Sequence, residues 1–270
     1  MAKTNLPDGT PIECIVRTEA RVLVEHTQGY LEQGIELPEN AVVFDVGANV
    51  GVFSVMLARS RKDVFLHAFE PIPPIAQVLK NNADTLGDGR IVVHPYGVGK
   101  EESSFEFMYF PRCPALSSAH MDLWENTPGA FTEAVRGHIR EAGKYMLAAR
   151  LVPSFLAAPI SHYLRGGSQK YTCKIQPLSK VFAEHDVQKV DLLKVDCEGA
   201  ELAVLEGVDD SQWPSIQQVV CEVMDVDGRL ETCQNLLKAK GFDRLAVVRE
   251  SGLENTPMYN LYAQRSIVAA

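Results

Sequence analysis

The sequence predicts one α/β domain built on a doubly wound, mostly parallel sheet, and two observations carry this prediction. From Asn40 onward, short runs of β-branched and aromatic residues alternate with stretches whose apolar residues recur at helical spacing. This alternation is typical of a parallel sheet that is covered by helices on both faces. The chain has 270 residues and a hydrophobic content of 46%, which is enough for one large core.

The expected elements follow in order along the chain. The five strands of the parallel sheet are expected at residues 41–45, 64–70, 91–94, 190–196 and 218–223. The helices between them are expected at residues 50–60, 75–86, 200–207 and 230–240, and Gly241 is a suitable end for the last one. Two further strands, at residues 244–248 and 260–264, are expected to form an antiparallel edge.

Two segments depart from this alternation. Residues 1–38 have weak periodicity and are expected to form an N-terminal arm, with a small strand pair and a helix near residues 30–34. Residues 112–168 interrupt the domain of residues 39–270, and Val135 and Ile139 belong to one apolar helical face there. The interpretation is a helical insertion. It forms either a lid at the ligand-binding rim of the sheet or a surface decoration.

Charge and composition disfavour several classes of partner. A formal net charge of -9 and a pI near 5.3 disfavour nucleic acid and anionic membrane surfaces, so a small-molecule partner is expected. The six cysteines lie far apart without a CxxC pair, which predicts neither a disulfide framework nor structural zinc. Because the sequence has neither the apolar run of a signal peptide nor about 18 consecutive apolar residues, the cytoplasm is the expected location. The oligomeric state stays open.

A glycine-containing turn follows the first strand, in the segment VVFDVGANVGVFSVMLAR. Gly47 and Gly51 let a ligand approach the backbone closely, and the helix N-terminus offers free N–H groups. The spacing differs from the G-x-G-x-x-G fingerprint of dinucleotide sites, because Asp45 stands two positions before the first glycine, separated from it by one residue. A carboxylate would repel a pyrophosphate but suits an ammonium group. This favours S-adenosylmethionine, which carries an ammonium group and no phosphate.

The second strand ends in the segment LHAFEP and puts Glu70 at its carboxyl end. In doubly wound sheets an acidic residue at this point accepts hydrogen bonds from the ribose hydroxyls of an adenosine-containing ligand. A solvated carboxylate at a strand end would be the ordinary interpretation of an isolated Glu. With the glycine turn one strand earlier, we expect Glu70 to bind the ligand.

Together, VVFDVGANVGVFS, AFEP and LLKVDCEGAELAVLEG resemble the FkbM family of class I S-adenosylmethionine-dependent methyltransferases. The segment from Lys194 to Glu201 is similar to that family's signature K-x-D-x-E-G-x-E. The resemblance implies a seven-stranded, Rossmann-like methyltransferase sheet and O-methylation of a hydroxyl on a sugar, polyketide or other secondary metabolite. The cofactor-binding residues that it implies are Asp45, Gly47, Ala48, Asn49 and Gly51 for the methionine part, and Glu70 with Pro71 for the ribose side.

Methyl transfer requires an acceptor oxygen in line with the methyl carbon and a route for the acceptor's proton. Asp196 is the first candidate for the reacting centre because it follows a buried strand at the ligand-binding rim, and Glu198 is the second. Glu201 is interpreted as a cap of the next helix. Two histidines, His26 in the arm and His120 in the insertion, are alternative bases.

A divalent cation would be another way to activate a hydroxyl. Asp196, Glu222 and Asp225 follow neighbouring strands of this type of fold and would suit Mg²⁺, which prefers oxygen ligands. Loop or cap carboxylates are the ordinary interpretation of such residues. The choice among a metal, an acidic base, a histidine base and alignment without a base stays open at this point.

Two other functions were weighed against an O-methyltransferase. An NAD-dependent oxidoreductase would require a phosphate-accepting glycine loop, with which Asp45 disagrees. A non-catalytic S-adenosylmethionine-binding protein would have damaged cofactor motifs, whereas those of this sequence are intact. The D/N-P-P-Y/F motif of DNA N-methylating enzymes is absent from the sequence.

Overall fold

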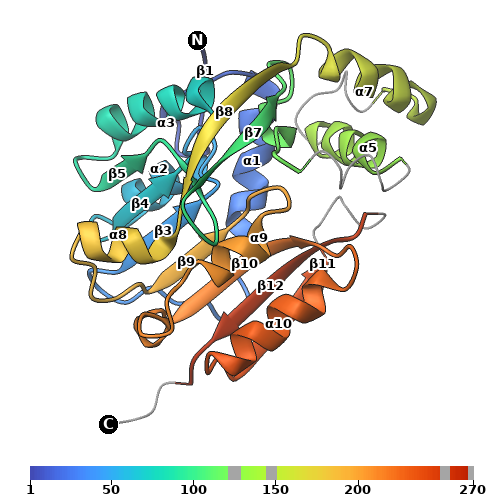
Figure 1. Cartoon of the computed structure of the whole chain (residues 1–270). Helices are drawn as coiled ribbons and strands as arrows, with labels where there is room; N and C mark the ends of the chain where they lie inside the picture. Colours follow the sequence, from blue (N-terminus) through green and yellow to red (C-terminus); the bar gives the residue numbers. More distant parts are fainter. Residues whose placement is uncertain (121–128, 144–150, 250–255, 267–270) are drawn as a thin grey trace.

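The computed structural model describes residues 1–120, 129–143, 151–249 and 256–266. Its central feature is a seven-stranded sheet in the order β11-β12-β10-β9-β3-β4-β5 (Figure 1). The strands are β3 (Val42–Val46), β4 (Phe65–Phe69), β5 (Ile91–His94), β9 (Leu192–Val195), β10 (Gln218–Met224), β11 (Arg244–Arg249) and β12 (Met258–Gln264). β12 pairs antiparallel with both of its neighbours, β10 and β11, and the other neighbouring strands of this sheet pair in parallel. The predicted doubly wound, mostly parallel sheet is confirmed.

Helices cover both faces of the sheet and divide its core into two layers. One face packs against α1 (Arg17–Gly29), α2 (Val52–Ser60) and α3 (Pro73–Leu86). The other face packs against α8 (Leu178–Glu184), α9 (Glu201–Glu206) and α10 (Arg229–Ala239), with the 3-10 turn η3 (Trp213–Ser215) beside them. The inner strands are mostly apolar on both sides because helices cover both faces of the sheet. Phe44 of β3 and Leu66 of β4, for example, are both fully buried.

The N-terminal arm contains the predicted strand pair, β1 (Ala2–Asn5) and β2 (Pro11–Cys14), which is antiparallel. The prediction of a helix near residues 30–34 is wrong, because the helix is α1 and ends at Gly29. Gln33 and Gly34 both adopt positive φ angles, of 53° and 81°, which a helix cannot continue through. The helical signal lies earlier, in buried Ala20 and Val24.

A second sheet, of three strands, connects the insertion to the rest of the domain. The sequence analysis did not predict it. It consists of β6 (Gly97–Val98), β7 (Ser103–Tyr109) and β8 (Gln169–Gln176) in the order β6-β8-β7. The antiparallel pairing of β7 with β8 ends at the pair Tyr109 and Gln169, so the two strands form a stem below the insertion. Figure 1 shows this stem as the long strand pair that leads toward α5 and α7.

The described part of the insertion is helical. It contains η1 (Pro114–Leu116), α5 (Ala130–Ala142), η2 (Ser154–Leu156) and α7 (Ala157–Arg165). The apolar face predicted around Val135 and Ile139 belongs to α5, which packs against α1 and α7. Some residues of the predicted insertion, 121–128 and 144–150, lie outside the described residues.

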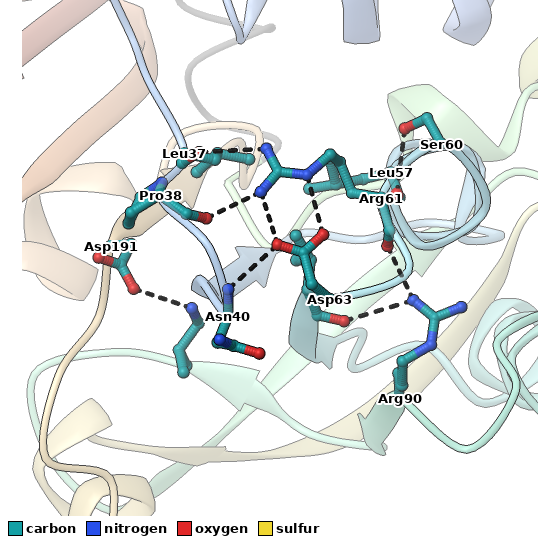
Figure 2. A network of polar contacts seen from close by, with 11 residues as sticks. Leu37, Pro38, Asn40, Leu57, Ser60, Arg61, Asp63, Arg90 and Asp191 are labelled. Atoms are coloured by element: carbon teal, nitrogen blue, oxygen red, sulfur yellow. Dashed lines mark hydrogen bonds and ion pairs between the residues drawn. The ribbon is translucent and has the colours of Figure 1, made fainter.

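The edge of the sheet opposite the carboxyl ends of the strands is held by a polar network (Figure 2). The guanidinium of Arg61 donates to both carboxylate oxygens of Asp63, at 3.0 and 2.7 Å, and to the backbone oxygens of Leu37 and Pro38. The backbone N–H of Asn40 donates to the same carboxylate. These contacts fix the segment that leads into β3. Hydrogen bonds from Arg61 lower the pKa of Asp63 well below its ordinary value.

All six cysteines are free thiols in the structure, and only Cys197 is not fully buried. Among the described residues, none of the helices combines the length and the apolar character that a membrane crossing needs.

Candidate active site

A cavity of about 310 Å³ lies at the carboxyl ends of β3, β4 and β9. Its walls come from the loop after β3, the ends of β4 and β9, α1, β7 and the segment 114–120 at the start of the insertion. This is where open α/β sheets bind their ligands. The volume is at the lower end of the range of about 300–1,000 Å³ that small-molecule sites occupy.

The loop after β3 is held against β4 and β9 by its own backbone. The N–H groups of Gly47 and Ala48 both donate to the carbonyl oxygen of Phe69, at 3.1 and 2.9 Å. Gly47 has a φ of 76°, and a Cβ at this position would lie 1.7 Å from the carbonyl oxygen of Asp196. Only glycine therefore fits here, because two ligand-binding loops touch through their backbones.

The rest of the loop turns into α2. Asn49 has a φ of 50°, which asparagine tolerates better than most residues, and its side-chain oxygen accepts a hydrogen bond from the N–H of Val50. Gly51 has a φ of 86°, and a Cβ there would lie 2.6 Å from Leu79. Gly47, Ala48 and Asn49 line the cavity, whereas Gly51 lies behind it against α3.

Asp45 lies beneath the loop instead of in the cavity wall. It is fully buried and accepts a hydrogen bond of 2.6 Å from the hydroxyl of Ser54. The Nζ atom of Lys194 lies 3.0 Å from its other carboxylate oxygen and donates to the carbonyl oxygen of Gly47 at 2.9 Å. In this structure the cation beside Asp45 is the ammonium group of Lys194, and the pair supports the loop from below.

Lys194 also links this pair to Asp196, which does line the cavity. Its Nζ atom lies 3.7 Å from the Oδ2 atom of Asp196, and the hydroxyl of Tyr30 donates to the same oxygen at 2.8 Å. Burial works to lower the pKa of Lys194, but the charges of Asp45 and Asp196 outweigh it and raise the pKa above its ordinary value. Lys194 is therefore a fixed positive charge at the floor of the site.

The second half of the K-x-D-x-E-G-x-E segment forms a tight turn into α9. Glu198 and Gly199 have positive φ angles of 52° and 109°. The Oε1 atom of Glu201 accepts hydrogen bonds from the N–H groups of Cys197 and Gly199, at 3.2 and 2.8 Å. Burial raises the pKa of Glu201 to about 7. Glu201 thus stabilises the turn that presents Glu198 to the cavity.

Glu70 is the buried carboxylate at the end of β4. It is 6% exposed, and its Oε1 atom accepts a hydrogen bond of 2.9 Å from the N–H of Ile72. Burial raises the pKa of Glu70 to about 7. Glu70 and Pro71 both line the cavity on the side next to the glycine loop.

The predicted bases come together in this cavity, whereas only two of the three predicted magnesium ligands, Asp196 and Glu222, line it. His26 on α1 and His120 beyond η1 line the cavity together with Asp196 and Glu198, although the sequence separates them widely. Glu222 of β10 lines it as well. Asp225 does not line the cavity; its carboxylate accepts a hydrogen bond from the N–H of Leu230 at the start of α10.

Asp196, Glu222 and Asp225 do not gather around one point. Within the described ranges, the only residues whose metal-ligating atoms meet in a group of three are histidines elsewhere in the molecule. The carboxylate of Asp196 is instead engaged by Tyr30 and Lys194.

Three functional residues were missed in the sequence. Tyr30, Lys194 and Ser54 support Asp196 and Asp45, and only Lys194 had a usable signal, because it belongs to the quoted signature. The register of the parallel pair β3 and β9 sets Lys194 opposite Asp45. A buried lysine in one parallel strand and a buried aspartate in its neighbour would have indicated this pair.

The fold and the site together define a class I, Rossmann-like methyltransferase. The sheet has the strand order given above, with β12 antiparallel, and the cavity at its carboxyl edge is lined by the glycine loop, Glu70 and Asp196. The methyltransferase FkbM domain matches residues 45–243. The chain belongs to the FkbM methyltransferase family, which confirms the resemblance seen in the sequence.

Several known proteins are similar to this chain. The 31-O-demethyl-FK506 methyltransferase FkbM of Streptomyces tacrolimicus is 32% identical over 89% of this chain and 88% of its own length. Methyltransferase sdnD of Sordaria araneosa is 32% identical over 77% of this chain and 75% of its own. The AMB antimetabolite synthetase AmbE of Pseudomonas aeruginosa is 30% identical over 97% of this chain, which spans only 12% of AmbE.

Among solved structures, the precorrin-6y C5,15-methyltransferase of Geobacter metallireducens superposes with a TM-score of 0.45 and 12% sequence identity. That superposition covers 90% of this chain and 87% of the other.

Proposed function

We propose that this methyltransferase takes its methyl group from S-adenosylmethionine and transfers it to a hydroxyl of a small or medium-sized metabolite. The observation that carries the proposal is the cavity's set of carboxylates, Glu70, Asp196, Glu198 and Glu222, around the glycine loop. S-adenosylmethionine is a cation with an ammonium and a sulfonium group. A cavity lined by several carboxylates favours such a ligand over one with phosphates.

The residues fit this cofactor from the loop outward. Gly47 lets the loop after β3 lie against the backbone of Asp196, where a Cβ would clash, and so keeps the loop backbone in the cavity wall next to the methionine part. Glu70 is the group for the ribose hydroxyls, since its carboxylate is buried at the end of the second strand of the nucleotide-binding half. Asp45, which has Lys194 as its partner, is assigned to the support of the loop.

When bound, S-adenosylmethionine supplies a methyl carbon whose bond to sulfur breaks as the acceptor oxygen attacks it. The protein has to hold the acceptor in line and receive its proton. Asp196 is our first candidate for this proton because it lines the cavity and its carboxylate is oriented by Tyr30. Glu198, His26 and His120 line the same cavity and are the alternatives.

Two supporting arguments concern the acceptor. The FkbM protein of Streptomyces tacrolimicus, named for a 31-O-demethyl substrate, is similar to this chain over most of both lengths, which favours a hydroxyl acceptor. Apolar residues from the insertion and its stem, such as Phe105, Phe107 and Leu116, line the cavity beside His120. They favour an acceptor with a substantial apolar part. Mg²⁺ has no assembled ligand set among the described residues and is not part of the proposal.

The experiment is a transfer assay with methyl-labelled S-adenosylmethionine and a panel of hydroxylated metabolites, with Asp196→Asn as the test variant. We expect a product whose label is on oxygen. In the variant, turnover should fall by about 100-fold or more, as for loss of a general base, while cofactor affinity stays within about threefold.

Label on nitrogen or carbon would contradict the O-methyltransferase. Loss of cofactor binding in Asp196→Asn would assign Asp196 to the cofactor instead of the acceptor. If Asp196→Asn retains turnover, the corresponding variants Glu198→Gln, His26→Asn and His120→Asn identify the base.

A further inference from the structure

Three histidines meet outside the active site, where the sheet lies next to the end of α8. His67 lies on β4, His94 ends β5, and His185 follows α8. One ring nitrogen from each histidine can be chosen so that all three lie within 4.8 Å of one another. No other group of three metal-ligating side chains meets this closely in the part of the chain that the structure describes.

The two buried rings are already arranged as a pair. The Nδ1 atom of His67 lies 3.0 Å from the Nε2 atom of His94. Two nitrogens bound to one tetrahedral ion at about 2.0–2.1 Å lie about 3.3 Å apart, so the separation of this pair is close to the one that a shared metal requires. The proton that one of the two nitrogens donates to the other would have to leave that nitrogen, and the rings would turn so that both lone pairs face the ion. The ring of His185 lies 5.0 Å from both other rings, centroid to centroid, and nearly perpendicular to them.

A further contact holds the ring of His94 on the side away from His67. The hydroxyl of Tyr96 lies 3.0 Å from the Nδ1 atom of His94. A donor–acceptor contact on the far nitrogen fixes the ring of a metal-bound histidine and its tautomer.

The third ring provides access. His185 is exposed, whereas His67 and His94 are 9% and 4% exposed. Because its ring is at the surface, it can move toward the buried pair without disturbing the core. The aromatic rings of Phe44 and Phe69 pack against the buried pair and hold its position.

We propose that His67, His94 and His185 form a binding site for one transition-metal ion of the Zn²⁺ type, with a fourth position open to water or another ligand. Three imidazole nitrogens suit Zn²⁺, Co²⁺ and Ni²⁺, and they do not suit Mg²⁺ or Ca²⁺, which prefer oxygen. The site is separate from the methyl-transfer cavity, since none of the three histidines lines that cavity.

The site nevertheless touches the cofactor side of the sheet. The ring of His94 stacks on that of Phe69, with centroids 4.4 Å apart, and its carbonyl oxygen accepts a hydrogen bond from the N–H of Glu70. An ion that fixes His94 would therefore also fix the end of β4.

The test uses the full chain without an affinity tag, treated with a chelator and then titrated with Co²⁺ while visible absorption is recorded. We expect saturation at one Co²⁺ per chain, with the bands of a low-symmetry, four- or five-coordinate ion, and displacement by Zn²⁺ but not by Mg²⁺. His185→Asn removes one ligand at the surface and leaves both buried rings in place. It should weaken Co²⁺ binding by about 100-fold or more. Loss of a residue that only hydrogen-bonds to a metal ligand costs about 10–100-fold, and loss of a ligand itself should cost more.

His162→Asn is the matched control because His162 is an exposed histidine on α7, away from the three-histidine group. It should bind Co²⁺ as the unaltered chain does. The proposal is overturned if Co²⁺ does not saturate at one per chain, if His185→Asn binds it unchanged, or if His162→Asn weakens binding equally.

Discussion

Replacing Lys194 with methionine should destabilise the protein far more than the loss of an ordinary lysine. Lys194 and Asp45 are 3% and 0% exposed in their side chains, and their charged atoms lie 3.0 Å apart. Methionine keeps the unbranched shape but leaves the Asp45 carboxylate buried with only the hydroxyl of Ser54 as a partner. Removal of one partner of a buried pair costs about 3–5 kcal/mol, which is a large part of a typical stability of about 5–15 kcal/mol.

The measurement is equilibrium unfolding in urea with linear extrapolation. The double variant Asp45→Asn with Lys194→Met should be more stable than Lys194→Met alone, because it removes the buried charge. Lys62→Met is the control, since Lys62 pairs with Asp88 at 3.1 Å but both side chains are more than half exposed, and it should cost less than about 1 kcal/mol. The reasoning fails if Lys194→Met stays within about 1 kcal/mol of the unaltered chain, or if the double variant is the less stable one.

Three further predictions concern the loop, the ribose carboxylate and the turn before α9. Gly47→Ala should weaken S-adenosylmethionine binding by about 100-fold in calorimetry, which is the scale on which small displacements of a site act. Gly89→Ala is the control, because Gly89 has a similar φ of 74° but open space around it, and it should leave binding unchanged. Equal effects of the two variants would refute the loop argument. Ribose hydroxyls donate to the ionised form of Glu70, and burial raises the pKa of Glu70 to about 7. The Kd of S-adenosylmethionine should therefore rise about tenfold as the pH falls from 8 to 6. A Glu70→Gln variant should lack this pH dependence. The pKa of Glu201 in the folded state is about 7, above its ordinary value of 4.5, so the folded protein keeps this proton to a higher pH than the unfolded chain and loses stability as the pH rises through that interval. In urea unfolding, the unaltered chain should lose about 2 kcal/mol of stability between pH 5 and pH 8 through this group, and Glu201→Gln should lack that loss. Parallel pH profiles of the two proteins would contradict this.

The central sheet could be predicted because its signal is local. Most of the parallel strands are apolar runs that a helical stretch follows, and the observed strands β3 and β10 start and end within one residue of the predicted ranges. The stem β7 and β8 was missed because its pairing is not local. The alternation of Phe105, Phe107 and Tyr109 is a strand pattern, but its partner lies beyond the insertion.

The candidate site was predictable in its residues and less so in their contacts. His26, His120 and Asp196 were chosen from three distant segments, and the structure brings them to one cavity. The sequence could not say that Lys194 occupies the position next to Asp45, because this depends on the register of β3 against β9. The carboxylates in the sequence likewise could not show whether Asp225 is a metal ligand or, as in the structure, accepts a hydrogen bond from the N–H of Leu230 at the start of α10.

The most direct test of the account is calorimetry of the unaltered chain with S-adenosylmethionine and, separately, with NAD. The acidic cavity and the loop around Gly47 predict one S-adenosylmethionine per chain with a Kd of about 1 μM to 1 mM, the range of ordinary enzyme substrates. NAD, with its two phosphates, should bind at least about tenfold more weakly. Tighter binding of NAD, or no heat from S-adenosylmethionine up to millimolar concentrations, would contradict the proposed cofactor.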